Sequence, residues 1–258
     1  VSYWARGGIA TVLTEERDEL VRSRPAFGDL LGGMTIAGGI AAALYKKATT
    51  GEGSVVDVSL LGLAAWNLSP DVAVSQIHGG GAIPKYGHAD APNPLVGTYR
   101  TKDDRYVQLM MLQLDKFYPE AMRTLGVPEL IDDPRFAAPA ARYENRVELI
   151  AILDDVFAQR TVAEWRVALA GLSGAWSIVQ TPGELCEDAA VTANGYIAHT
   201  TTTNGAPYAL PTNPVQFDEQ PVVPPGAPEH GQHTEEVLMD AGFTWEAIER
   251  YKESGAIL

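Results

Sequence analysis

The longest run of small and apolar residues lies between positions 30 and 47, where polar side chains are rare. Apolar residues on every side of a helix, instead of along one stripe, indicate a helix that is buried on most sides. Lys46 and Lys47 fall in its last turn, where positive charges suit the carbonyl end of a helix. The pattern therefore predicts a largely buried helix over residues 30–47, beginning just after Asp29.

An acidic residue set between glycines stands at the start of this helix. Gly28 allows a tight backbone turn, and the unpaired N–H groups at a helix N-terminus favour an ionised carboxylate at Asp29. On the local pattern alone, an N-cap is the commonest role of an aspartate in front of an apolar run. Further glycines leave the helix surface open to close approach by another chain or a flat ligand: Gly32, Gly33, Gly38 and Gly39.

Shorter elements surround the apolar helix in the first part of the chain. The pattern predicts a polar helix over residues 14–22, a β-branched strand over residues 54–60 and a helix over residues 61–68. Helix, strand and helix in this order are typical of an α/β domain with a largely parallel sheet. Residues 70–94 are rich in glycine and proline, include the triplet Gly79-Gly80-Gly81, and predict a long connection.

The second half of the chain has the pattern of an α+β unit followed by an extended segment. Residues 97–111 predict two strands joined by a turn at residues 102–104, and a short strand is expected at residues 176–180. The prolines of residues 195–228 predict extended chain. Helices are expected at residues 115–125, 145–159, 161–171 and 245–252, with shorter ones opening at Pro182 and near Thr234.

Charge and cysteine content limit the classes of function. The 258 residues carry a formal net charge of -14 with an isoelectric point near 4.7, which argues against binding to nucleic acid or to an anionic membrane. Cys186 is the one cysteine and the five histidines are scattered, so neither an internal disulfide nor a zinc site is expected. No segment of transmembrane length and no leader are expected. The resulting prediction is a metal-free cytoplasmic protein.

Several motifs along the chain share one likeness. They are Tyr3-Trp4-Ala5-Arg6-Gly7-Gly8, Gly28-Asp29, Thr50-Gly51-Glu52-Gly53 with the segment after it, Asn93-Pro94, Asp133-Pro134-Arg135-Phe136 and Gly231-Gln232-His233-Thr234-Glu235-Glu236. In this order they resemble the family III CoA-transferases, the group that includes formyl-CoA transferase and carnitine CoA-transferase. The resemblance implies that the family's N-terminal portion, with the first strands of the large domain and most CoA contacts, is absent from this sequence.

The resemblance also implies a fold. It is an α/β fold that combines part of a Rossmann-like large domain with a smaller α+β domain, joined by long linkers. Residues 1–70 would be the partial large domain with the catalytic helix, 71–95 a linker, 96–175 the small domain, 176–229 an extended segment, and 230–258 C-terminal helices that return to the large domain.

A site is implied in the same way. In such enzymes the aspartate of the Gly-Asp pair is the nucleophile, which maps onto Asp29, and Gly28 lies in the substrate site. The Gly79-Gly80-Gly81 loop would fold over Asp29 and exclude water. The substrates would be an acyl-CoA thioester and a carboxylic acid, with coenzyme A moving through an aspartyl-CoA thioester and no permanently bound cofactor. Family members form interlocked homodimers, and no nucleic-acid or membrane partner is expected.

Two other interpretations stay open. Acyl-CoA racemases of the α-methylacyl type share the aspartate and add an upstream histidine and a glutamate in the first strand of the small domain. That glutamate position falls at Arg100, and no histidine precedes His78, so transfer is favoured over racemisation. The third interpretation is a catalytically inactive fragment that needs a partner chain. The sequence does not identify the donor and acceptor acids.

Overall fold

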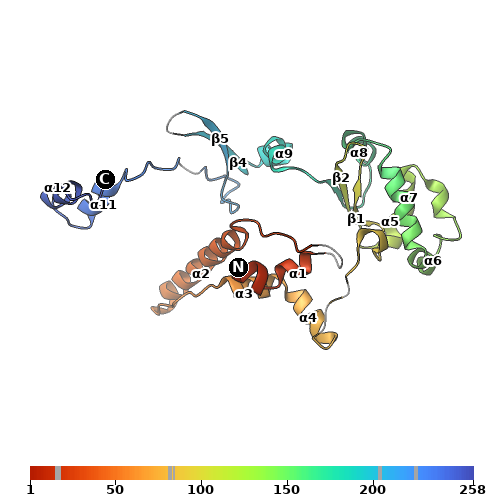
Figure 1. Ribbon diagram of the computed structural model, residues 1–258, viewed down its shortest axis with the longest axis horizontal. Coiled ribbons are helices and arrows are strands. Elements are labelled where there is room, and N and C mark those ends of the chain that lie inside the picture. Colours follow the sequence, from red (N-terminus) through yellow and green to blue (C-terminus); the bar gives the residue numbers. More distant parts are fainter. Residues whose placement is uncertain (15–18, 81–82, 84, 203–204, 224–225) are drawn as a thin grey trace. The chain divides into compact units, whose positions relative to one another are not determined.

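A computed structural model describes residues 1–258 except positions 15–18, 81–82, 84, 203–204 and 224–225 (Figure 1). The chain divides into two compact units, residues 1–178 and residues 179–258. The predicted division into five segments stays a prediction. The expected helix, strand and turn content is largely present, and its exceptions lie mainly in the first part of the chain.

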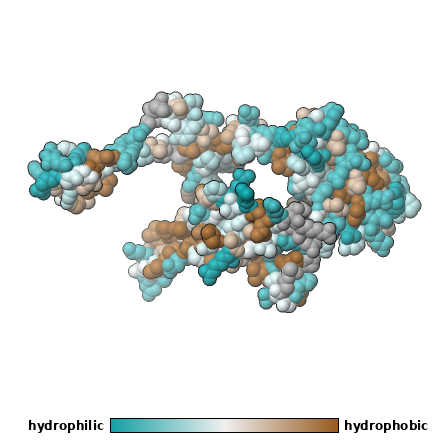
Figure 2. Space-filling view, in the orientation of Figure 1, coloured by the Kyte–Doolittle hydropathy of each residue, from teal (hydrophilic) through white to brown (hydrophobic). Residues whose placement is uncertain are grey.

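The apolar helix forms as predicted and is longer, because α2 runs over Phe27–Thr50. It ends at Gly51, whose left-handed backbone (φ 79°) lets its N–H bond to the carbonyl of Lys47. The expectation of burial on most sides is wrong for this chain, since Gly28 and Gly32 are the buried residues of the helix. Figure 2 shows the apolar residues along this helix at the surface, and Leu30 is 71% exposed.

The length of α2 also corrects an expectation about membranes. By length and composition alone, this helix is long and apolar enough to cross a membrane, although no segment of that kind was predicted. The core helix of a soluble protein passes the same test.

A small cluster of short helices packs against the first turns of α2. These are the π-helical turn η1 (Ser2–Arg6), α1 (Ile9–Leu13) and α3 (Leu60–Asn67), followed by α4 (Ser69–Ile77). Tyr3, Ile9 and Ala64 form the buried centre of this cluster. Ser59 caps α3 by accepting a hydrogen bond from the backbone N–H of Gly62.

Three predictions for this region need correction. Residues 54–59 are not a strand, because no other described strand lies beside them and Val55 is 88% exposed. Residues 19–24 are not helical, while the middle of the predicted polar helix lies outside the described residues. The predicted connection begins instead with α4, which carries a proline in its first turn, where the missing N–H costs nothing.

A three-stranded antiparallel sheet organises the second part of this unit. Its strands are β1 (Val96–Arg100), β2 (Tyr106–Met110) and β3 (Trp176–Ile178), in the order β1-β2-β3, with the one-turn η2 (His88–Asp90) before them. The hairpin of β1 and β2 is confirmed, with Tyr99 opposite Val107. Both described sheets are antiparallel, so the expected parallel sheet is absent from the part of the chain that is described, and the Rossmann-like large domain stays a prediction.

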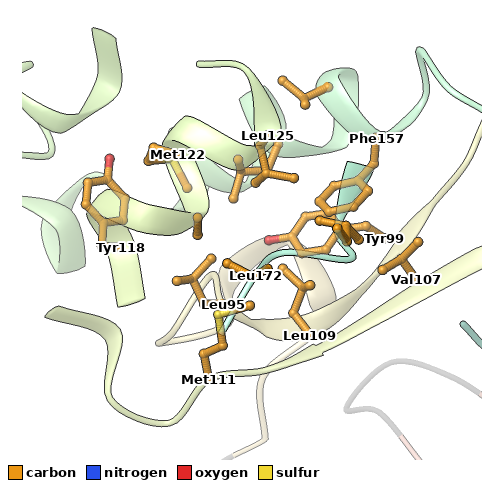
Figure 3. Packing of buried hydrophobic residues seen from close by; sticks show 14 of the residues in the cluster. Leu95, Tyr99, Val107, Leu109, Met111, Tyr118, Met122, Leu125, Phe157 and Leu172 are labelled. Carbon is orange, nitrogen blue, oxygen red and sulfur yellow. The ribbon is translucent and has the colours of Figure 1, made fainter. Parts of the chain in front are cut away.

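Helices cover this sheet and enclose the main core. They are α5 (Leu114–Leu125), η3 (Pro128–Ile131), α6 (Pro139–Glu144), α7 (Arg146–Phe157) and α8 (Val162–Ala168), of which α6 was not predicted. Figure 3 shows part of this core, including the rings of Tyr99 and Phe157, whose centroids are 4.7 Å apart. Trp165 lies against Phe157 and donates its indole N–H to the carbonyl of Phe157 at 2.9 Å. Burial raises the pKa of the Tyr99 hydroxyl well above its usual range.

The second unit consists of short elements. They are α9 (Pro182–Glu187), α10 (Ala189–Ala193), the hairpin of β4 (Ile197–Thr201) and β5 (Pro207–Pro211), α11 (Thr234–Asp240) and α12 (Trp245–Glu253). The predicted helix starts after Thr181 and Thr244 are confirmed, because both threonines accept a hydrogen bond from a first-turn backbone N–H.

Candidate functional site

Asp29 lies in the first turn of α2, but it does not cap the helix. The N-cap is Ala26, which has a left-handed backbone (φ 59°) and accepts the first helical hydrogen bond from Leu30 N–H at 2.9 Å. The interpretation of Asp29 as a plain N-cap is therefore wrong. Its side chain is exposed and stands near unpaired backbone N–H groups at the positive end of the helix dipole.

A cavity of about 210 Å³ opens beside Asp29. It is lined by residues from the start of the chain, from the segment before α2 and from the start of α3: Val1, Tyr3, Trp4, Ser23, Arg24, Pro25, Ala26, Phe27, Gly28, Asp29 and Leu60. The lining combines aromatic and aliphatic residues with one acidic and one basic residue, Asp29 and Arg24. Asp29 is among the residues that a small organic molecule in this cavity would lie against.

Close packing of Tyr3 fixes the backbone next to Asp29. Tyr3 is 7% exposed, and its hydroxyl accepts a hydrogen bond from the side-chain amide of Asn67 at 2.8 Å. A Cβ atom on Gly28 would lie 2.7 Å from the Cγ and 2.8 Å from the Cβ of Tyr3. Only glycine therefore fits at position 28 without displacement of the ring, and the Gly-Asp pair is explained by this contact.

The irregular segment before α2 is held in place by residue 21. Its carbonyl accepts a hydrogen bond from the Trp4 indole N–H at 3.0 Å, and its N–H donates to the hydroxyl of buried Thr14 at 3.0 Å. The Trp4 ring also makes an edge contact with Phe27, with ring centroids 6.4 Å apart. These contacts bring Arg24 to the cavity wall, although residues 19–24 have no regular secondary structure.

The glycine triplet lies elsewhere. Gly79 and Gly80 follow α4 with left-handed backbones (φ 70° and 80°), and Gly81 lies outside the described residues. Gly80 N–H bonds to the carbonyl of Ser75 at 2.7 Å, so these two glycines terminate a helix. Neither of them lines the cavity beside Asp29. That the loop folds over Asp29 stays a prediction.

The structure joins Gly28 and Asp29 in one cavity wall and adds residues that the sequence interpretation did not single out. Arg24 and Asn67 carried no signal, because neither belongs to a recognisable motif. Tyr3 and Trp4 stood out only as part of the motif in front of the first Gly pair. Among the described residues, no group of three or more His, Cys, Asp or Glu side chains is arranged to hold a metal ion.

The chain is similar to several known proteins. The chain is 32% identical to the cinnamoyl-CoA:phenyllactate CoA-transferase of Clostridium sporogenes, over 100% of this chain and 63% of that protein. It is 28% identical to the (R)-2-hydroxy-4-methylpentanoate CoA-transferase of Clostridioides difficile, over 99% of this chain and 64% of that protein. The chain thus spans a little under two thirds of the length of these two relatives.

Solved structures share the fold. A CaiB/BaiF family protein from Brucella suis superposes with a TM-score of 0.75 at 24% identity, over 92% of this chain and 61% of that one. A model of the family described as "CoA-transferase family III" matches residues 1–234. The resemblance drawn from the sequence motifs is therefore confirmed, and the chain belongs to CoA-transferase family III.

Proposed function

We propose that the protein carrying this chain transfers coenzyme A from an acyl-CoA thioester to a carboxylic acid, with Asp29 as the nucleophile. The observation that carries this proposal is the position of Asp29 at the wall of a small cavity beside the first turn of α2. The names of two relatives support the reaction class, since both are CoA-transferases.

The chemistry needs one carboxylate and two nucleophilic exchanges. An oxygen of Asp29 attacks the thioester carbonyl of the donor, the carbon–sulfur bond breaks, and a mixed anhydride and a CoA thiolate result. The thiolate then attacks the Asp29 carbonyl, which releases the donor acid and leaves an aspartyl-CoA thioester. The acceptor carboxylate repeats these steps in reverse and restores Asp29 as a carboxylate.

Local structure supports this role in two ways. Unpaired backbone N–H groups lie in the first turn of α2, where Asp29 is also placed. The same N–H groups, near Gly28, would donate hydrogen bonds to the oxyanion of each tetrahedral intermediate. Tyr3 holds the backbone at Gly28 by close contact, so the nucleophile starts from a defined position.

The broader features of the protein belong to the same proposal. It acts in the cytoplasm as an interlocked homodimer, needs no permanently bound cofactor, metal, membrane or nucleic acid, and uses the Gly79-Gly80-Gly81 loop to exclude water. The proposal does not specify the donor and acceptor acids, because the names of the relatives include acids as different as phenyllactate and glutarate. A homodimer would cover the apolar face of α2 that is exposed in one chain.

Racemisation is the weaker candidate. The resemblance assigns its glutamate to the position of Arg100, and that residue is a cation at the end of β1. Arg100 is paired with the carboxylate of Asp104 at 2.8 Å, so it cannot act as the second acid or base. An inactive chain that needs a partner is the remaining candidate.

Mass spectrometry of the full-length protein after incubation with acyl-CoA tests the proposal. We expect a CoA adduct on the peptide that carries Asp29. Asp29→Ala should abolish both adduct and transfer, and Asp29→Glu should lower turnover by roughly 100-fold or more, because one methylene misplaces the nucleophile. Asp71→Ala is the matched control, since Asp71 also lies in the first turn of a helix, and it should retain activity. Near-normal turnover of either Asp29 variant would refute the assignment.

A further inference from the structure

Arg24 brings a positive charge to the cavity beside Asp29. Of the described residues that line this cavity, Arg24 and Asp29 are the two with charged side chains. No hydrogen bond or ion pair joins Arg24 to another described residue. The chain as a whole carries a net charge of -14, so the positive charge of Arg24 is opposite in sign to the net charge of the protein.

The position of Arg24 is set by its neighbours in sequence. On the N-terminal side of Arg24, hydrogen bonds to Trp4 and Thr14 hold the backbone of residue 21 in place. On the other side Pro25 restricts the backbone, and α2 begins at Phe27. Arg24 therefore lies on a short span between two fixed points, and it is among the residues that line the cavity although the span is irregular.

We propose that Arg24 binds the carboxylate of the acid substrate. This inference rests on the proposed function, in which Asp29 carries the coenzyme A. A guanidinium offers two parallel N–H donors that match the two oxygens of a carboxylate. The cavity that Arg24 and Asp29 both line has a volume of about 210 Å³.

The proposed reaction gives a guanidinium at this place a role. An acceptor acid reaches the aspartyl-CoA thioester as an anion, and one of its oxygens must attack the Asp29 carbonyl while the carbon–sulfur bond breaks and CoA thiolate leaves. One negative charge is present throughout this step, because it passes from the acid to the tetrahedral oxyanion and then to the departing thiolate. A guanidinium on the same wall attracts the acid and orients it for attack.

The test separates binding of the acid from the chemistry at Asp29. In the full-length protein, Arg24→Gln should raise the KM for the acceptor acid by roughly 10- to 100-fold, the size expected for loss of a charge-assisted hydrogen bond. Arg24→Lys, which retains the charge but not the paired donors, should give an intermediate KM. Arg22→Gln is the matched control, because Arg22 lies in the same segment and does not line the cavity.

A second measurement uses an uncharged nucleophile. Hydroxylamine attacks the aspartyl-CoA thioester through nitrogen, breaks the carbon–sulfur bond and releases coenzyme A without any carboxylate. Arg24→Gln should release coenzyme A with hydroxylamine at the wild-type rate and with the acid more slowly. The role of Arg24 would be overturned if Arg24→Gln left the KM for the acid unchanged, or if it raised the KM for acyl-CoA and not the KM for the acid. Absence of any CoA adduct on wild-type Asp29 would overturn the proposed function as well.

Discussion

Replacing Gly28 with alanine tests how firmly the backbone beside Asp29 is fixed. The added Cβ would meet the Cβ and Cγ atoms of Tyr3 at 2.8 and 2.7 Å, closer than non-bonded carbon atoms approach. These atoms are next to the backbone of Tyr3, so a change of rotamer at the far end of the ring does not relieve the contact. Tyr3 is also 7% exposed and has little room to move.

The magnitude follows from two opposing effects. Forcing an extra methyl group into a packed site costs about 1–3 kcal/mol. Alanine is favoured over glycine in a helix by up to about 1 kcal/mol. We therefore expect Gly28→Ala to lower the free energy of unfolding by about 1–2 kcal/mol, measured from urea titrations followed by circular dichroism.

Two comparisons separate the contact from the change of residue type. Gly171→Ala is the control, because a Cβ at Gly171 has nothing within 4 Å and its φ is not positive, so the variant should be stabilised by about 0.4–1 kcal/mol. In a Tyr3→Gly background both obstructing atoms are gone, and Gly28→Ala should become neutral or stabilising. Equal effects of Gly28→Ala in both backgrounds would refute the reasoning, since contacting residues should not be additive.

Two further predictions concern the unit formed around the three-stranded sheet. Thr101 and then the backbone N–H of Val162 donate hydrogen bonds to Asp103, and they hold the pKa of that carboxyl below its usual range. This contribution to stability is complete above the unfolded pKa of about 3.9 and is lost as the pH falls through the lower folded pKa. Asp103→Asn should therefore lower the urea midpoint of unfolding at pH 7, and the midpoints of the variant and the wild type should become equal in acid. Phe157→Ala removes a fully buried ring stacked on Tyr99 and should cost about 3–5 kcal/mol in the same assay; a loss below about 1 kcal/mol would contradict the packing.

Elements specified by nearby residues were predictable from the sequence. The α8 helix begins after Thr161, whose hydroxyl accepts from Glu164 N–H while the Glu164 carboxylate accepts from Thr161 N–H. That reciprocal pair is visible in the sequence as a Thr and a Glu three positions apart. The β1–β2 hairpin was equally local, because its strands are adjacent in the chain and joined by a short turn. In both cases the partner groups come from the same or adjacent short stretches of the chain.

Elements that depend on distant partners were not predictable in this way. Residues 54–59 have the composition of a strand, but a strand needs hydrogen bonds from a neighbour, and the described chain supplies none there. The site shows the same limit. Asp29 was found through its motif, whereas Arg24 reaches the cavity because Trp4 and Thr14 hold residue 21, contacts that no local pattern records.

The glycines of α2 show which part of its surface this chain uses. Gly28 is packed by Tyr3, and a Cβ on Gly39 would lie 2.7 Å from Cγ1 of Val56, so these two positions serve contacts within the chain. Gly33 and Gly38 have nothing within 4 Å. A glycine inside a helix costs about 1 kcal/mol relative to alanine, and no contact of the described chain offsets that cost at either position. In the proposed homodimer, a second chain could approach the helix closely at these two positions, and the contacts it makes there would offset the cost of the glycines.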